Sequence, residues 1–277
     1  MKIGVRGHDI INGKTNPENL VGALKSAGMD TVQLVCHKSI EGTEYVPGSQ
    51  NAEKAAFIGR AFGNNMHIAL LGAYFNPVHP NKEIVETGIA VFRDNIEYAK
   101  TIGSDVVASE TGSYQGDPWV YHPKNRTPEA LNAVIDIFCG LAAYASKHSV
   151  CVGIEGAAGH VCHDIRALKH VVDSIGTDNI RVVFDYFNFM DGEHTDYIKI
   201  LNEGLSVFPK IHCFHIKDCV LDGSLNQVPV GQGDMDFKKI LSLIKQYDKD
   251  AVLILEGTPD TDAARSAAFL RDIWGTV

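Results

Sequence analysis

The stretch Cys151-Val-Gly-Ile-Glu155 is a short apolar run that ends in an acid, and runs of this kind recur along the whole chain. Such runs, bounded by turn residues, are typical of buried strands. Between them lie segments with helical periodicity, which begin at capping signals such as Asn16-Pro17-Glu18 and Thr127-Pro128-Glu129. The predicted strands cover residues 2–5, 31–35, 67–71, 105–108, 151–154, 180–184, 211–216 and 251–255. The predicted helices cover residues 17–28, 51–64, 82–102, a segment from 128 onward, 163–175, 195–208, 236–247 and 260–273.

The order of these elements predicts the fold class. Each predicted strand is followed by one helix, and the pair repeats through the chain without a linker or a low-complexity stretch. This pattern is typical of an α/β protein, a single (β/α)8 TIM barrel that occupies residues 1–277. An open sheet that binds a dinucleotide would need a G-x-G-x-x-G turn after its first strand. Gly4-Val-Arg-Gly7-His8 lacks that pattern.

Composition excludes several classes of protein. The chain carries 34 acidic and 25 basic residues, a net charge of -9, which argues against a nucleic-acid partner but not against a small anionic substrate. Neither a basic, apolar leader nor a run of about 18 apolar residues is present, so we expect a cytoplasmic protein with no membrane partner. The six cysteines form no CxxC pair, so reduced thiols are expected rather than disulfides or a zinc finger.

The carboxyl ends of the strands are the place to look for an active site in such a barrel. The last four predicted strands end in side chains that can bind a metal: Glu155, Asp185, His215 and Glu256. Three carboxylates around one imidazole would repel one another strongly in a dry cavity that held no cation. The set therefore predicts one divalent ion. Oxygen ligands with one imidazole suit Mn, Mg or Co, while Zn and Fe stay open.

Strand alternation tests whether these side chains converge, because barrel side chains point alternately inward and toward the helices. On the last strand Glu256 shares a face with Val252 and Ile254, which are typical of a barrel interior. On the seventh strand His215 and Lys217 share a face with Cys213. Phe214 and Ile216 are then expected to pack under the helices, and His212 is expected to point outward.

Four segments resemble the xylose isomerase-like superfamily of sugar phosphate isomerases and epimerases. They are Gly153-Ile-Glu155, Phe184-Asp185-Tyr-Phe-Asn188, His215-Ile-Lys217-Asp218 with the following Gly231-Gln-Gly233, and Ile254-Leu-Glu256-Gly257. In that superfamily Glu, Asp, His and Glu from strands five to eight hold one divalent ion. In its ketose 3-epimerases the two glutamates exchange protons with the sugar through an enediolate. The resemblance implies that Glu155 and Glu256 are the catalytic pair.

Two positions depart from the ketose 3-epimerase pattern. Asn188 stands where those epimerases carry histidine, and Leu221 stands where they use an arginine to bind the substrate. These differences favour a substrate other than a free ketohexose.

Five side chains are candidates for substrate binding because of their position at strand ends or on the loops that follow. Lys217 could bind a substrate oxyanion or phosphate, or could pair with a ligand carboxylate. His160 could contact a substrate hydroxyl or cap the next helix. A phosphate would be expected near Lys217, Gly231 and Gly233, because barrels often bind phosphate after strands seven and eight. His8 and Gln33, on the first two strands, are more typical of side chains that bond a neighbour. The five candidates are Asn76, Glu110, His160, Asn188 and Lys217.

The sequence therefore predicts a divalent-metal-dependent isomerase or epimerase of a small sugar or sugar phosphate. A lyase of the same superfamily, a dehydratase of the inosose or dehydroshikimate type, stays open, because removal of a proton beside a carbonyl also begins an elimination. A non-catalytic sugar-binding barrel and assembly into a homo-oligomer stay open too. The acidic charge disfavours a DNA-repair endonuclease on the same barrel.

Overall fold

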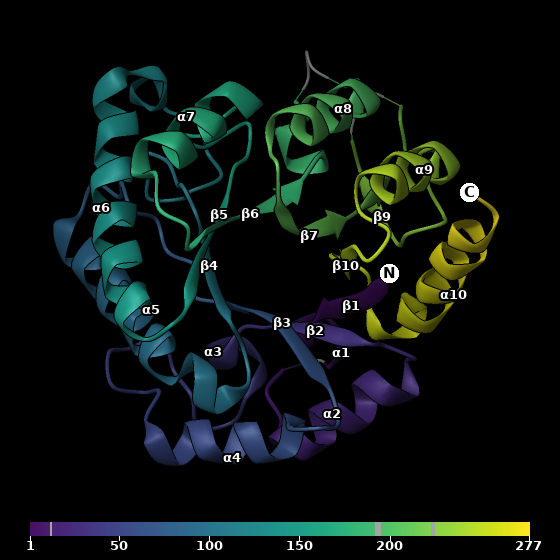
Figure 1. Cartoon of the computed structure of the whole chain (residues 1–277), viewed down its shortest axis with the longest axis horizontal. Helices are drawn as coiled ribbons and strands as arrows, with labels where there is room; N and C mark the ends of the chain where they lie inside the picture. Colours follow the sequence, from purple (N-terminus) through teal and green to yellow (C-terminus); the bar gives the residue numbers. More distant parts are fainter. Residues whose placement is uncertain (12, 192–194, 223–224) are drawn as a thin grey trace.

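Eight parallel strands close into a barrel at the centre of the computed structural model, which describes residues 1–11, 13–191, 195–222 and 225–277. Strands that follow one another in the chain are neighbours in the barrel, and β1 pairs with β10 to close it. Figure 1 shows the strands inside a ring of helices. The sequence-based prediction of a single (β/α)8 barrel is confirmed. The barrel strands are β1 (Lys2–Arg6), β2 (Thr31–Leu34), β3 (His67–Gly72), β4 (Val106–Glu110), β5 (Cys151–Glu155), β6 (Ile180–Asp185), β7 (Ile211–Ile216) and β10 (Val252–Leu255).

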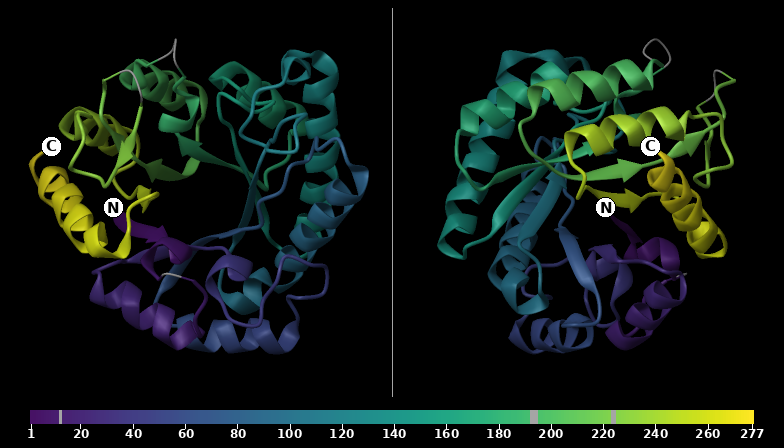
Figure 2. Two further views of the ribbon diagram at one scale, coloured as in Figure 1. Left: turned by 180° about the vertical axis from the view of Figure 1, so that it is seen from behind. Right: turned by 45° about the vertical axis from the view of Figure 1, so that its right-hand side comes forward.

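The helices that follow the strands form the outer layer, and the two further views in Figure 2 show this layer around the barrel. They are α2 (Pro17–Ser26), α4 (Ala52–Phe62), α5 (Lys82–Ile102), α6 (Pro128–Lys147), α7 (Ile165–Ile175), α8 (Tyr197–Val207), α9 (Phe237–Tyr247) and α10 (Asp260–Thr276). The expectation of one helix per strand is incomplete, because short elements also form on the loops at the carboxyl ends of the strands. These are the helices α1 (Gly7–Ile10) and α3 (Cys36–Ser39), the 3-10 turns η1 (Pro123–Arg126) and η2 (Phe187–Phe189), and the hairpin of β8 (Asp218–Cys219) and β9 (Gln227–Val228).

The capping signals in the sequence act as expected at the helix starts. The Asn16 side chain accepts the N–H of Asn19 at 2.8 Å, and Thr127 Oγ1 accepts the N–H of Ala130 at 3.3 Å. Each bond satisfies one of the backbone donors that a first helical turn leaves without a partner. The caps fix where the chain leaves each loop, and thus where the loops lie over the barrel mouth.

The two faces of the barrel strands pack in two separate apolar clusters. Val183, Cys213 and Ile254 belong to a small cluster inside the barrel, whereas Phe214 and Ile216 pack in the larger core between the strands and the helices. This division confirms the alternation that places Asp185, His215 and Glu256 on the interior face.

His212 does not follow the alternation, and the expectation that it points outward is wrong. Its Nε2 lies 2.7 Å from the carbonyl oxygen of Ala69 on β3, on the far side of the barrel. The pairing of β6 with β7 shifts at this point, because Val182 pairs with Ile211 while Val183 pairs with Cys213. His212 is thus the extra residue of a β-bulge, which locally breaks the two-residue period.

The helix α6 is long and apolar enough, by length and composition alone, to cross a membrane. Its apolar side chains Val134, Phe138 and Leu141 are buried in the core between the helices and the strands. Packing on the barrel accounts for the apolar face of this helix.

Candidate metal centre

The four predicted metal ligands meet at the carboxyl ends of β5, β6, β7 and β10. One ligand atom from each of Glu155, Asp185, His215 and Glu256 lies within 4.8 Å of the corresponding atom of every other. Asp185 and His215 are fully buried, and Glu155 is only 2% exposed. Neighbouring strands in the barrel bring these side chains together, because Asp185 pairs with His215 and Ile254 pairs with His215 in register.

The imidazole of His215 is oriented by hydrogen bonds on both of its nitrogens. Its Nδ1 lies 3.1 Å from Glu155 Oε1 and 3.0 Å from Glu256 Oε2, and its Nε2 lies 2.7 Å from Gln33 Oε1. The Gln33 amide nitrogen donates to the Tyr74 hydroxyl at 2.7 Å, so its oxygen accepts the hydrogen of His215 Nε2. A metal-binding imidazole needs this arrangement, in which one nitrogen donates to a neighbour and the other faces the ion. The donor set therefore fits a divalent cation.

The carboxylates and the imidazole also influence one another's protonation. Burial alone would lower the pKa of His215, but the carboxylates of Glu155 and Glu256 raise it to about 10. Burial would raise the pKa of Glu256, yet Lys217 and His215 hold it well below its usual value. Burial raises the pKa of Asp185 despite the nearby Lys217 ammonium. Negatively charged carboxylates and the cationic groups of His215 and Lys217 thus lie in close contact in this cluster.

Gln33→Leu is expected to weaken divalent-metal binding roughly 10- to 100-fold, the usual effect of removing a hydrogen bond behind a metal-binding histidine. The variant removes the acceptor that keeps His215 Nε2 protonated. Competition against a metal chelator measures the change directly. Gln50→Leu is the matched control, because Gln50 is also buried and lies in a separate small cavity. Equal affinity in wild type and Gln33→Leu would contradict this role.

Lys217 lies among the carboxylates rather than in the open cavity. Its Nζ is 2.9 Å from Asp185 Oδ2 and 2.9 Å from Glu256 Oε1, and the Arg6 guanidinium is also 2.9 Å from Glu256 Oε1. Two protein cations thus already offset part of the carboxylate charge from which the sequence predicts a divalent ion. Of the two roles considered for Lys217, the contacts favour pairing with ligand carboxylates.

Asn188 bridges the same cluster. Its amide nitrogen donates to Glu155 Oε1 at 2.9 Å, and its amide oxygen accepts from Lys217 Nζ at 2.6 Å. Both ends of the amide are thus engaged by protein groups. These contacts favour orientation of Glu155 over direct binding of a substrate.

A cavity of about 430 Å³ opens above the cluster. This volume suits a small molecule. Of the four candidate ligands, Glu155 and Glu256 line the cavity, and Asp185 and His215 lie behind them. The rest of the lining is Arg6, His8, Gln33, Lys38, Tyr45, Tyr74, Phe75, Asn76, His79, Ile84, Glu110, Gly116, Pro118 and Trp119.

Glu110 and His160 lie next to each other at the end of β4 and on the loop after β5. Glu110 Oε2 is 3.9 Å from His160 Nε2, and the indole of Trp119 packs on the imidazole with ring centroids 4.7 Å apart. Burial raises the pKa of Glu110 to about 8, and the carboxylates of Glu155 and Glu256 add to the shift. Glu110 lines the cavity, whereas His160 is fully buried behind Trp119.

Asn76 holds two loops together. Its amide nitrogen donates to the carbonyl oxygens of Ser113 and Gln115, and its amide oxygen accepts the N–H groups of Val78 and Ser113. The amide nitrogen and oxygen of the Asn76 side chain are therefore both hydrogen-bonded to the backbone. Although Asn76 lines the cavity, its contacts favour shaping of the wall over recognition of a substrate.

The loop after β7 is closed by Asp218. The backbone N–H groups of Gly231 and Gly233 each donate to Asp218 Oδ2 at 2.9 Å, and the N–H groups of Cys219 and Met235 donate to Oδ1. The two glycine amides that could have bound a phosphate are therefore already paired. The expectation of a phosphate at Gly231 and Gly233 does not fit these contacts.

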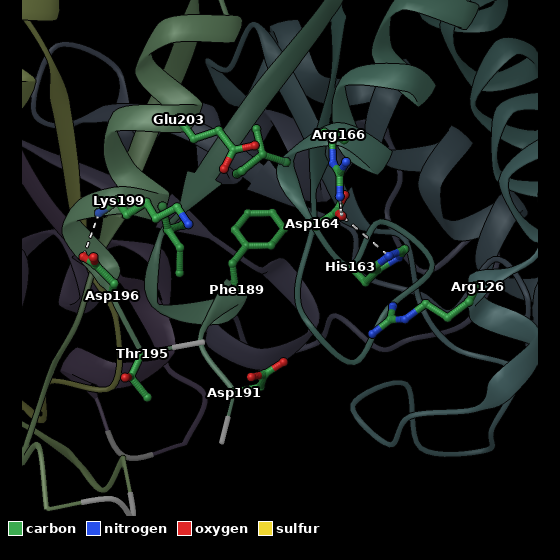
Figure 3. A pocket seen from close by; sticks show the side chains of 12 residues that line it. Arg126, His163, Asp164, Arg166, Phe189, Asp191, Thr195, Asp196, Lys199 and Glu203 are labelled. Carbon is green, nitrogen blue, oxygen red and sulfur yellow. Dashed lines mark hydrogen bonds and ion pairs between the residues drawn. The ribbon is translucent and has the colours of Figure 1, made fainter. Parts of the chain in front are cut away.

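A second, larger cavity of about 770 Å³ lies between the loops that lead into α7 and α8. Figure 3 shows that its charged side chains include residues paired with one another, such as Asp164 with His163 and Arg166. Glu155, Asp185, His215 and Glu256 do not line it. We therefore place the candidate site in the cavity at the barrel mouth.

Sequence reasoning missed several residues at the cavity. Arg6 ends β1 in the same way that Glu155 ends β5, so its strand-end position was a signal that could have been used. Lys38 lies on the short helix α3, and Tyr45 and Trp119 lie on loops; nothing in their local sequence marks them.

Comparison with known proteins agrees with this geometry. The family model described as xylose isomerase-like TIM barrel matches residues 21–273. The chain belongs to this family. Two relatives of the xylose isomerase-like chain are the "Uncharacterized protein MJ1311" of Methanocaldococcus jannaschii and the "Probable L-ribulose-5-phosphate 3-epimerase UlaE" of Mycoplasma pneumoniae. The first is 22% identical over 92% of this chain and 85% of the relative. The second is 24% identical over 67% of this chain and 57% of the relative.

Solved structures of the xylose isomerase-like fold superpose over the whole chain. A D-tagatose 3-epimerase-like protein has a TM-score of 0.78 at 18% identity and covers 100% of this chain and 98% of its own. The IOLI protein, solved with a zinc atom, has a TM-score of 0.72 at 18% identity and covers 100% of this chain and 99% of its own. At such identities the likeness establishes the fold.

Proposed function

We propose that this xylose isomerase-like protein is a divalent-metal-dependent isomerase or epimerase of a small sugar or sugar phosphate. The observation that carries the proposal is the division of the cluster: Glu155 and Glu256 reach the cavity, while Asp185 and His215 lie behind them. Two carboxylates are thereby presented to a bound molecule from one buried, charged centre. The epimerase names of a curated relative and a structural neighbour support the same reaction class.

Glu155, Asp185, His215 and Glu256 would hold the ion. When bound, a divalent cation supplies Lewis-acid stabilisation of the negative charge that develops beside the substrate carbonyl. One of the two glutamates accepts the proton from the carbon next to the carbonyl, and the electron pair of that C–H bond forms an enediolate. The other glutamate returns a proton to that carbon or to its neighbour.

The surrounding side chains orient these two carboxylates. Asn188 donates to Glu155 at 2.9 Å, and Arg6 contacts Glu256 at 2.9 Å. Fixed geometry of this kind lowers the cost of reaching the reactive arrangement. Tyr74, Phe75 and Trp119 form the aromatic part of the cavity wall.

Incubation of the metal-loaded protein with a panel of free and phosphorylated ketoses in deuterium oxide tests the proposal. We expect deuterium at the carbon next to the carbonyl, detected by NMR or mass spectrometry, even where the net conversion is small. A product that has lost water would instead identify a dehydratase. Absence of label from every ketose, with Mn, Mg, Co and Zn each supplied, would reject enediolate chemistry and favour a sugar-binding barrel.

Asn188→Ala is expected to lower kcat about 10-fold or more with little change in KM, because its contacts are with Glu155 and Lys217. Steady-state kinetics on the substrate found by the deuterium screen measures both constants. Asn202→Ala, on the exposed face of α8, is the control and is expected to leave both unchanged. A rise in KM at constant kcat would instead indicate that Asn188 binds the substrate.

A further inference from the structure

We propose that the cavity binds a phosphate monoester of the substrate on its β1–β3 side, with Lys38 as the cation that recognises the phosphate. This inference rests on the proposed sugar isomerase function and adds the chemical class of the substrate. It assigns the phosphate to the loops after the first three strands, instead of the loop after β7.

Lys38 is the cavity cation that is available to a ligand. Arg6 pairs with Asp9 and Glu256, and Lys217 is enclosed by Asp185, Glu256 and Asn188. Lys38 lies on α3, lines the cavity and is exposed. Throughout the described ranges, its ammonium makes no hydrogen bond or ion pair. An unpaired ammonium at a cavity wall attracts an anion as a compact point charge.

The position of Lys38 fits an anion remote from the reacting carbon. In the barrel order, β2, which leads into α3, is separated from β5 by β3 and β4, and from β10 by β1. Lys38, Glu155 and Glu256 all line the one cavity. A molecule whose carbonyl end lies at the two glutamates would extend its other end toward Lys38.

Two histidines on the same side add hydrogen-bonding groups. His8 on α1 lines the cavity, and its buried Nδ1 has no hydrogen-bond partner within the chain as described. His79 accepts the N–H of Asn81 on Nδ1 at 2.9 Å, so in the neutral ring its Nε2 carries the hydrogen and can donate. The Nε2 hydrogen of His79 thus adds a donor to the cavity wall that carries Lys38, as a phosphate group requires.

The loop after β7 offers no comparable site, because its glycine N–H groups already donate to the Asp218 carboxylate. The cavity wall around Lys38 is thus more favourable to a phosphate than that loop.

The test measures binding of three probes to the full chain: inorganic phosphate, L-ribulose 5-phosphate and L-ribulose. Inorganic phosphate is titrated by phosphorus NMR after chelator treatment, so that no metal binds it. We expect Lys38→Met to weaken binding of inorganic phosphate and of L-ribulose 5-phosphate about 10- to 150-fold, the loss expected for one charge-assisted hydrogen bond. Binding of L-ribulose is expected to stay unchanged.

Two further variants control for charge and folding. Lys38→Arg keeps the positive charge and is expected to retain most of the affinity for phosphate. Lys147→Met removes an exposed lysine from the last turn of α6, and is expected to leave phosphate binding as in wild type. Phosphate affinities that are equal in wild type and Lys38→Met would overturn the proposal, and so would an equal loss of L-ribulose binding.

The outcome is separable from that of the proposed function. Deuterium exchange into free ketoses with no effect of Lys38→Met on phosphate binding would overturn only the phosphate site. Loss of phosphate binding in Lys38→Met would support the site even if no ketose exchanged its proton, a result that would count against the isomerase reaction alone.

Discussion

Glu155→Gln and Glu256→Gln are each expected to slow solvent-deuterium exchange into the substrate by about 10²- to 10⁴-fold, the range of a general acid or base contribution. Glutamine keeps the size of the side chain and an oxygen, but it cannot accept a proton at neutral pH. Both positions line the cavity, so the loss should appear chiefly in kcat. Single-turnover exchange followed by NMR measures the exchange rate of each variant.

The metal content of each glutamine variant must be determined alongside the rate, because loss of the ion would also lower it. Glu53→Gln, on the exposed start of α4, serves as the matched control and should exchange at the wild-type rate. Near wild-type exchange by either cavity variant, with metal still bound, would remove that glutamate from proton transfer.

Removal of the divalent ion is expected to lower Tm by roughly 8 °C or more. An ion that binds the native state alone and is present at 1,000 times its Kd adds about 4 kcal/mol to the free energy of unfolding. For a chain of this size, each kcal/mol corresponds to roughly 2–4 °C. Elemental analysis of purified protein should find one divalent ion per chain, and calorimetry before and after chelation should show the fall in Tm.

Asp185→Asn provides the comparison for this experiment. It removes the charge of a fully buried candidate ligand, so its Tm should respond little to chelation or to added metal. Protein that contains no divalent ion after incubation with Mn, Mg, Co or Zn would contradict the metal centre. A change of Tm on chelation that is as large in Asp185→Asn as in wild type would contradict this set of ligands.

The sequence predicts the barrel and the convergence of the four ligands because both follow from short-range periodicity. A run such as Val252-Leu-Ile-Leu-Glu256 fixes the strand, the inward face and the residue at its carboxyl end at once. Neighbouring parallel strands then bring their ends together, as Asp185 and His215 show. The roles of these side chains in metal binding and proton transfer remain predictions.

The second layer around the ligands could not be predicted, since it depends on contacts across the barrel. Gln33 reaches His215 from β2, and Lys217 folds back onto carboxylates of two other strands. Asn76 was expected to contact a substrate, but its amide is used between two loops that no local pattern pairs. The bulge at His212 also lies outside a strict two-residue period.

Closure of the barrel and completion of the cluster depend on the same segment. The strand β10 pairs with β1 along Lys2–Val5, and the residue directly after it is Glu256. Until β10 docks, β1 has an edge with unpaired backbone groups, which invites pairing with another chain. An ion that requires Glu256 therefore favours the docked strand. During synthesis and refolding, metal availability would thus act on aggregation as well as on activity.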